Sequence, residues 1–235
     1  MKQIPHSSTV VRRGGAALLL ATALFAAVFS YLAAAFDYPE VLDRQSGQVL
    51  PALLALGPIG RGVWLLYALI PLLLIPTALA VRELTRAYSP RLTRGGMSLG
   101  VLSAAAMTAG LIRWPTLQWS LAGTWTLADP AERLVIAQRF DTANRLLGNA
   151  LGEFAGELCL NGFFLVAAFA IARATRQRWL MVAGIAASGL GWIAMLRNLT
   201  TAVAPVAALN NAVLPLWMLV LGVSMVRAAS GTRAS

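Results

Sequence analysis

Residues 141–172 read DTANRLLGNALGEFAGELCLNGFFLVAAFAIA, a polar stripe that leads directly into an apolar run. Every fourth residue of the stripe is polar, and these residues are Asp141, Arg145, Asn149, Glu153, Glu157 and Asn161. The apolar character of residues 146–172 predicts a membrane-spanning helix, which needs about 20 mostly apolar residues. Glu153 and Glu157 would therefore lie inside a membrane helix. Ionisable groups at that depth are costly and usually face a protein interior or water, so both are candidate functional residues.

The composition of the whole chain supports the same class. Hydrophobic residues make up 58% of the 235 residues, charged residues only 12%, and the mean hydropathy is +0.70. These values exclude an ordinary soluble domain. We predict an all-α, multi-pass integral membrane protein, a single transmembrane domain over residues 1–235 that forms a six-helix bundle. Its predicted helices cover residues 14–36, 62–81, 97–112, 146–172, 179–196 and 205–226.

The first apolar segment could also be interpreted as a signal peptide. Arg12 and Arg13 precede it, and three alanines at 33–35 are typical of a cleavage site. The apolar run is, however, longer than the roughly 7–15 residues of a signal peptide. We therefore expect a retained first helix.

The distribution of basic residues predicts the topology. Six crossings place both termini on one side, and twelve of the 19 lysines and arginines are then on that side. They are Lys2, Arg12, Arg13, Arg82, Arg86, Arg91, Arg94, Arg173, Arg176, Arg178, Arg227 and Arg233. The positive-inside rule predicts cytoplasmic termini, and the excess of arginine over lysine favours a bacterial inner membrane. Attraction to anionic lipid accounts for the basic pI without nucleic acid.

Metal and redox chemistry have few candidate residues. Cys159 is the single cysteine and His6 the single histidine. An intrachain disulfide is excluded, and a metal site built from His or Cys is hard to assemble. We interpret Cys159 as a small packed residue and His6 as part of a loose tail. We expect no cofactor and no metal.

Two long connections on the outer side are predicted to contain structure of their own. Residues 37–61 alternate apolar residues with charges and breaks, which favours short helices in the interface. Residues 113–140 contain Trp114, Trp119 and Trp125, and tryptophan prefers the headgroup level. These segments either anchor loops on lipid or cap a cavity. Asp129, Pro130 and Glu132 form a helix start, so a helix from here could run through the stripe.

The depth of the polar stripe follows from the arginines at the cytoplasmic end of the fourth helix. Counting back about 20 residues places the outer hydrocarbon boundary near Glu153, with Glu157 roughly 6 Å deeper. On a regular α-helix, Asn149 would share a face with both glutamates. Beside this face, glycines at 148, 152 and 156 form a small-residue ridge that lets another helix approach closely.

Arginines on other helices are the predicted partners of the carboxylates. Arg61, Arg113 and Arg197 are expected at the level of Glu153. An arginine–carboxylate cluster inside the bundle is the natural arrangement, since an unpaired charge there costs more than a paired one. Such a cluster either holds helices together or lines an outward-facing cavity.

The spacing Glu153-x-x-x-Glu157 resembles the paired glutamates of undecaprenyl-pyrophosphate phosphatases. That resemblance implies hydrolysis of a lipid pyrophosphate, but the Gly/Ser/Arg-rich loop of those enzymes has no counterpart here. Motif matches without their structural context are mostly false. We expect no catalytic residues.

The chain also resembles an uncharacterised bacterial membrane family, domain of unknown function 4386. The residues that carry this resemblance are FDYPEVL at 36–42, after the first helix, and Arg113-Trp114 after the third. The resemblance implies a six-helix bundle and no particular activity. The Leu-Tyr-rich first helix of many members is missing from this chain.

We interpret the chain as a non-enzymatic binding or transport protein for a small cation, a proton, or a polar or lipid-headgroup ligand. The candidate ligand-binding residues are Glu153, Glu157, Asn149, Arg145, Asn161, Arg113, Arg197 and Asp141. The alternative is a structural or regulatory membrane subunit whose stripe packs helices or docks a partner. Expected partners are the bilayer, a small polar ligand or lipid headgroup, and a second copy or another membrane protein.

Overall fold

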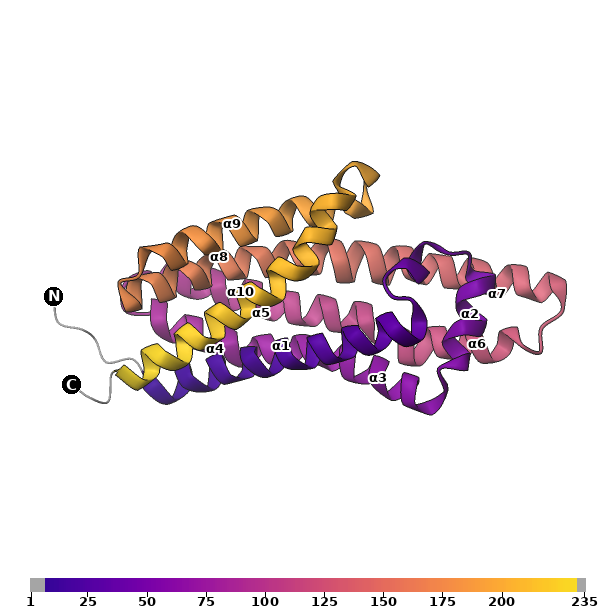
Figure 1. Ribbon diagram of the computed structural model, residues 1–235, viewed down its shortest axis with the longest axis horizontal. Helices are drawn as coiled ribbons and strands as arrows, with labels where there is room; N and C mark the ends of the chain where they lie inside the picture. The colour runs from indigo at the N-terminus through magenta and orange to yellow at the C-terminus, as the bar shows by residue number, and fades with distance from the viewer. Residues whose placement is uncertain (1–6, 232–235) are drawn as a thin grey trace.

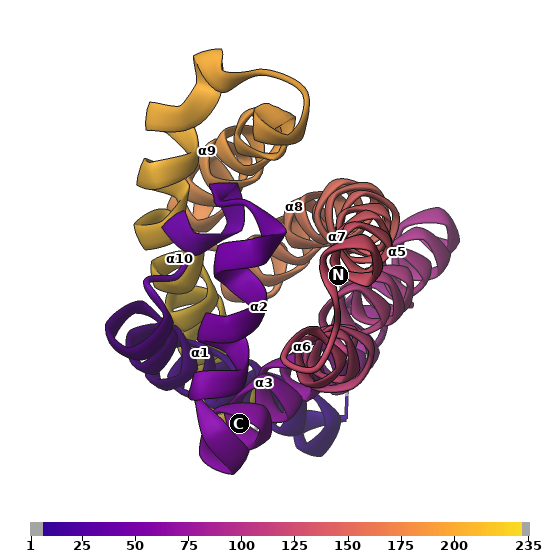
Figure 2. The same cartoon turned by 90° about the vertical axis from the view of Figure 1, so that its right-hand side faces the viewer.

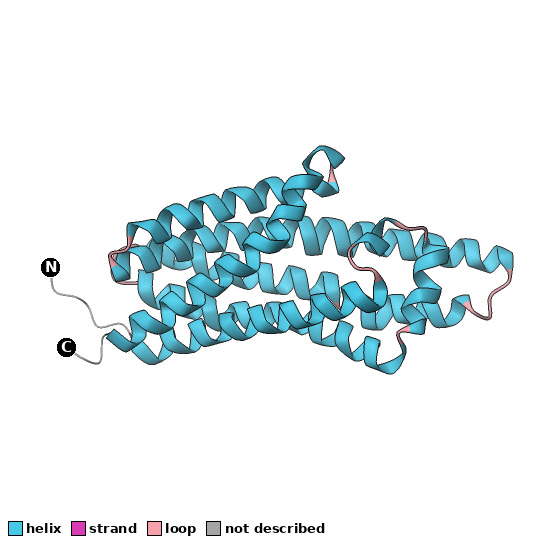
Figure 3. Cartoon of the chain, viewed as in Figure 1, coloured by secondary structure: helices cyan, strands magenta, loops and turns pink. Residues whose placement is uncertain are grey.

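The computed structural model describes residues 7–231, so Lys2, His6 and Arg233 lie outside the described residues. All regular structure within that range is helical (Figure 1, Figure 3). Four short 3₁₀ turns and two π-helical segments join or extend the α-helices. In chain order the elements are α1 Ser8–Phe36, η1 Glu40–Asp43, α2 Ser46–Ala55, α3 Gly57–Leu69, η2 Ile70–Leu73, α4 Leu74–Thr85, α5 Pro90–Leu111, η3 Trp114–Gln118, α6 Trp119–Trp125, α7 Pro130–Ala143, η4 Asn144–Ala155, α8 Gly156–Thr175, α9 Arg178–Ala194, η5 Met195–Asn198, η6 Thr201–Val203 and α10 Ala204–Gly231.

Six helical runs within the described residues are long and apolar enough to cross a membrane, which confirms the predicted fold class at this level. Each predicted helix lies inside one of them. The runs are Ser8–Phe36, Gly57–Thr85, Pro90–Trp125, Pro130–Thr175, Arg178–Asn198 and Thr201–Ser230.

The runs are arranged as an elongated bundle with two unlike ends. α1 begins and α10 ends at one end, where the α4–α5 and α8–α9 turns also lie (Figure 1). The opposite end carries α2, α6 and α7, which Figure 2 shows facing the viewer. The segments whose charges were grouped on one side in the sequence are therefore gathered at one end of the bundle.

Glycines let the first helix pack closely against its neighbours. A Cβ atom added to Gly14 would lie 2.7 Å from the Pro76 carbonyl oxygen, and one added to Gly15 would lie 2.8 Å from the Gly222 carbonyl oxygen. Small residues permit this approach of helix backbones, which is a main source of packing energy between membrane helices. α1 is thereby held between α4 and α10.

The connection at 113–140 contains structure of its own, and the helix that begins after Asp129 runs through the polar stripe. This segment is not a loop but two helical extensions, one completing the run Pro90–Trp125 and the other beginning the run Pro130–Thr175. The second run starts at a capping box: Glu132 N–H donates to the Asp129 carboxylate at 2.9 Å, and Asp129 N–H donates to the Glu132 carboxylate at 3.0 Å. The N–H groups of Asp129 and Glu132 therefore both have hydrogen-bond acceptors, so the helix can begin well before the apolar stretch. The location of α2 and α6 in a membrane interface stays a prediction.

Candidate functional site

Two of the helices that carry predicted site residues, α5 and α8, adjoin π-helical segments near the site. The short segment Trp114–Gln118 follows α5, and the longer segment Asn144–Ala155 precedes α8. In the first, the Gln118 N–H donates to the Arg113 carbonyl at 2.7 Å, five residues back. Pro115 has no N–H to donate, which interrupts the α-helical pattern there. π-Helical turns are rare and occur frequently at functional sites.

The structure brings Glu153, Glu157 and Arg197 together as one ion-pair cluster, which we call the carboxylate site. Arg197 donates from Nη1 to Glu157 Oε2 at 2.9 Å and from Nη2 to Glu157 Oε1 at 2.6 Å. Its Nη2 also lies 3.1 Å from Glu153 Oε2. The paired fork of Arg197 and Glu157 is the strong form of this interaction. With two carboxylates and one guanidinium, the three side chains carry a formal charge of one negative unit.

The helix hairpin α8–α9 explains why these residues meet. α8 and α9 are antiparallel and joined by a turn of two residues, so the end of α9 returns to the level at which α8 began. Glu157 is in the first turn of α8, and Arg197 is in the 3₁₀ turn Met195–Asn198 that follows α9. The side chains are enclosed to different degrees: Arg197 is 33% exposed, Glu153 27% and Glu157 15%.

A second polar group lies beside the carboxylate site, between the two π-helical segments. Arg113, buried to 6% exposure, donates from Nη1 to the Gly110 carbonyl oxygen and from Nε to Asn144 Oδ1 at 3.1 Å. Gln118 Nε2 donates to the same Asn144 oxygen at 3.0 Å. We call Arg113, Gln118 and Asn144 the arginine–amide cluster. Arg113 interacts electrostatically with Glu153, although its hydrogen bonds go elsewhere.

The predicted glycine ridge makes room for this arrangement. A Cβ atom on Gly148 would lie 2.5 Å from Arg113 Nη2, so only glycine leaves space for the guanidinium. One step along the ridge, a Cβ on Gly152 would lie 3.0 Å from the Gly110 Cα atom of α5. The two helix backbones are therefore in direct contact next to the polar groups.

Arg61, also predicted at this level, does not pair with a glutamate. Its Nε donates to the Pro115 carbonyl oxygen at 2.9 Å, and its guanidinium lies 5.8 Å from the centre of the Trp119 ring. This arginine therefore supports the π-helical turn at 114–118.

An aromatic cluster borders the site, with side chains from the connection after α1, from α3 and from the segment after α5. Trp64 and Trp114 stack with ring centres 4.6 Å apart, and both are buried. The rings of Tyr38 and Tyr67 meet edge to face with their centres 6.3 Å apart. Burial raises the pKa of Tyr38 to about 12, and the negative charge of Glu153 acts in the same direction. Tyr38, in the connection after α1, is therefore an electrostatic neighbour of Glu153.

The remaining predicted residues are not part of the carboxylate site. Asn161 is buried one turn deeper, where its Nδ2 donates to the Glu157 carbonyl oxygen at 2.8 Å. Asp141, Arg145 and Asn149 are exposed, and none of them has a side-chain hydrogen bond or ion pair with another residue in 7–231. The wider π-helical turn changes which side chains share a face, so the four-residue spacing does not keep Asn149 beside Glu153.

Sequence reasoning missed Gln118, Asn144, Tyr38 and Tyr67 as neighbours of the site. An amide side chain beside three tryptophans was a usable signal for Gln118. The tyrosines had none, because they come from segments far away in the chain.

The comparisons with known proteins do not assign a family. No family model matches the chain, and it matches no curated protein and no solved structure. The resemblance to domain of unknown function 4386 therefore stays a prediction. Within residues 7–231, no group of three His, Cys, Asp or Glu side chains is placed to hold a metal ion.

Proposed function

We propose that this protein binds, or carries across the membrane, a small cation or a proton at the carboxylate site. A polar or lipid-headgroup ligand with a positively charged group fits the same chemistry. The observation that carries the proposal is a partly exposed cluster in which two carboxylates share the single guanidinium of Arg197, while Arg113 acts on Glu153 without a hydrogen bond to it. Intramembrane ionisable groups are functional-site candidates because they are expensive to maintain.

The unequal use of the two carboxylates supports a cationic ligand. Both oxygens of Glu157 accept hydrogen bonds from Arg197, whereas Glu153 uses only Oε2. Glu153 Oε1 accepts no hydrogen bond from any other described residue. Glu153 is also more exposed than Glu157. The structure therefore favours Glu153 as the group that meets the ligand and Glu157 as the group that holds Arg197.

The two π-helical segments support a functional origin for this arrangement. A π-helical stretch is less favourable than the α-helix it replaces, and it persists only where the surrounding packing requires it. Here both stretches lie where the polar side chains of two neighbouring helices meet.

The first experiment measures the thermal stability of detergent-purified protein across pH and with a panel of sodium, potassium, primary amines and lipids. A ligand that binds the folded state raises stability by about 2.7 kcal/mol at 100 times its dissociation constant. We expect stabilisation of the wild type that is absent from the variant E153Q/E157Q. The matched control is E40Q/D141N, which removes the same charge from two exposed carboxylates without an ion-pair partner within 7–231. Equal stabilisation of all three proteins would exclude the carboxylate site as the binding site.

The paired fork of Arg197 and Glu157 favours a second candidate, a structural membrane subunit in which the cluster only ties α8 to the end of α9. This candidate predicts that E153Q/E157Q is less stable under every condition and that no ligand restores a difference. A double variant with wild-type stability and normal assembly would count against it.

We further propose a bacterial inner-membrane location with cytoplasmic termini, which is supported by the gathering of basic segments at one end of the bundle. The test places single cysteines at Leu127 and Gln177 in a C159S background. Both positions are exposed and lie at opposite ends. A membrane-impermeant maleimide should label L127C in intact cells and Q177C only after permeabilisation. The reverse pattern would invert the topology.

A further inference from the structure

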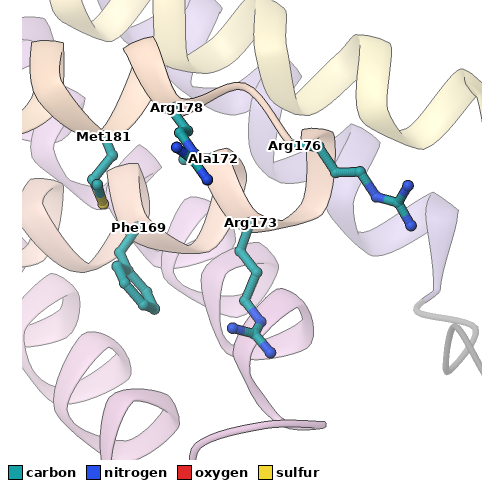
Figure 4. Close-up of a pocket in the computed structure, with 6 residues that line it drawn as sticks. All are labelled: Phe169, Ala172, Arg173, Arg176, Arg178 and Met181. Atoms are coloured by element: carbon teal, nitrogen blue, oxygen red, sulfur yellow. The ribbon is translucent and has the colours of Figure 1, made fainter. Parts of the chain in front are cut away.

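The turn between α8 and α9, at the end of the bundle opposite the carboxylate site, carries three arginines that we call the arginine turn: Arg173, Arg176 and Arg178. They line a hollow of about 370 Å³ whose other walls are Phe169, Ala172 and Met181 (Figure 4). A hollow of this size can receive a small charged group together with part of an apolar chain.

The charges of the arginine turn are not compensated by the described part of the chain. None of the three guanidinium groups forms an ion pair with a carboxylate in residues 7–231. Glu83, in the last turns of α4 at the same end of the bundle, forms an ion pair with Arg86 at 2.8 Å and accepts a hydrogen bond from the Ser7 N–H at 2.7 Å. The arginine turn is therefore a site of net positive charge that is open to an anion.

The geometry combines positive charge with an apolar surface. Figure 4 shows the side chains of Phe169, Arg173 and Met181 extending to the same side of the hairpin, while Arg176 extends beyond the turn. Phe169 is 38% exposed. An anionic headgroup at the arginines would leave its hydrocarbon chain beside these apolar side chains.

Two further features border the hollow. The Arg173 guanidinium lies 4.5 Å from the centre of the Tyr88 ring, which restricts its position. The Tyr88 ring also contacts Phe169, with ring centres 6.4 Å apart, so it supports two of the residues that line the hollow. α9 begins at Arg178 without a side-chain cap, which leaves N–H groups of its first turn available to an anion.

We propose that the arginine turn binds a phosphate group, supplied by the headgroup of an anionic phospholipid whose acyl chain lies against Phe169 and Met181. Arginine matches the geometry of phosphate oxygens through paired N–H donors. Basic pockets between membrane helices are known places for anionic headgroups. The site is independent of the carboxylate site, so it stands or falls separately from the function proposed above.

The test uses the full-length protein in a neutral detergent, titrated with phosphatidylglycerol, with phosphatidylcholine of the same chains, and with inorganic phosphate. Native mass spectrometry counts the bound lipid. We expect phosphatidylglycerol to bind in preference to phosphatidylcholine and at least about tenfold more weakly to R173Q/R176Q/R178Q, since each arginine near an anionic lipid adds to the attraction. Competition by millimolar inorganic phosphate that this variant abolishes would support the phosphate site with soluble phosphate as its occupant.

Two control variants keep the test decisive. R12Q/R13Q/R227Q removes the same charge from three exposed arginines at the same end, and it should bind like the wild type. R173K/R176K/R178K keeps the charge and should recover most of the binding. Equal losses in both glutamine variants, a lysine variant as weak as the glutamine variant, or equal binding of the two lipids would each overturn the proposal.

Discussion

The two ends of the bundle use arginine in opposite ways. At the carboxylate site, Arg197 is held by two glutamates, and nearby Arg113 is held by a carbonyl and an amide oxygen. At the arginine turn, three arginines lie on the surface without a carboxylate partner in residues 7–231. A charge enclosed by the protein must be compensated by other protein groups, whereas a surface charge can be solvated by water or paired with a lipid headgroup. The difference therefore separates arginines that shape the fold from arginines available to a partner.

The largest effect is expected when the arginine of the carboxylate site is removed. R197Q would leave Glu153 and Glu157 facing each other without compensation, at a cost of about 3 kcal/mol, near the low end for a buried pair because Arg197 is 33% exposed. Thermal and denaturant unfolding in detergent measure this loss. The control R145Q removes an exposed arginine from the helical run that carries Glu153 and Glu157, and it should change stability by no more than about 0.5 kcal/mol. Equal, small losses of unfolding free energy in both variants would contradict the difference between enclosed and surface arginines.

A smaller effect is expected where the helix backbones touch beside the arginine–amide cluster. In G110A the new Cβ atom would lie 2.6 Å from the Gly152 Cα atom, which should cost about 1 to 3 kcal/mol by overpacking. The control G189A adds a methyl group in α9 with no atom within 4 Å, and it should gain roughly 0.5 to 1 kcal/mol because alanine favours the helix. Unfolding of both variants under one condition tests the difference. A stable G110A would mean that this contact can relax.

The smallest effect on stability is expected at the arginine turn. In lipid-free detergent, R173Q/R176Q/R178Q should unfold within about 0.5 kcal/mol of the wild type for each substitution, since no ion pair is lost. Thermal and denaturant unfolding in detergent, as for R197Q, measure this difference. A loss comparable to that of R197Q would show that surface arginines also support the fold.

Much of the fold follows from patterns that the sequence displays openly. Apolar runs of sufficient length predicted six helices, and Asp129 with Glu132 predicted the start of the longest run. The meeting of Glu153 and Glu157 with Arg197 was also expected, because short turns between antiparallel helices return the chain to the same level. Length, capping and charge compensation are local or nearly local rules, so one sequence suffices for them.

The parts that were missed depend on geometry that periodicity does not encode. The four-residue spacing assumes a regular α-helix, and the segment Asn144–Ala155 is π-helical. Asn144 therefore turns toward Arg113, while Asn149 faces outward. Tyr38 and Tyr67 reach the site only through the packing of separate helices. Neither the sequence nor the arrangement of the side chains identifies one ligand, so the proposed binding experiment uses a panel of cations, amines and lipids.

The helical run Pro130–Thr175 is longer than one membrane crossing requires. Its 46 residues extend over roughly 70 Å at the usual rise of a helix, more than twice the ~30 Å of a bilayer's hydrocarbon core. With its C-terminal half in the lipid, its N-terminal half would extend past the hydrocarbon core, where it packs against α6. Leu127, 90% exposed in the connection between α6 and α7, would then lie beyond the hydrocarbon core.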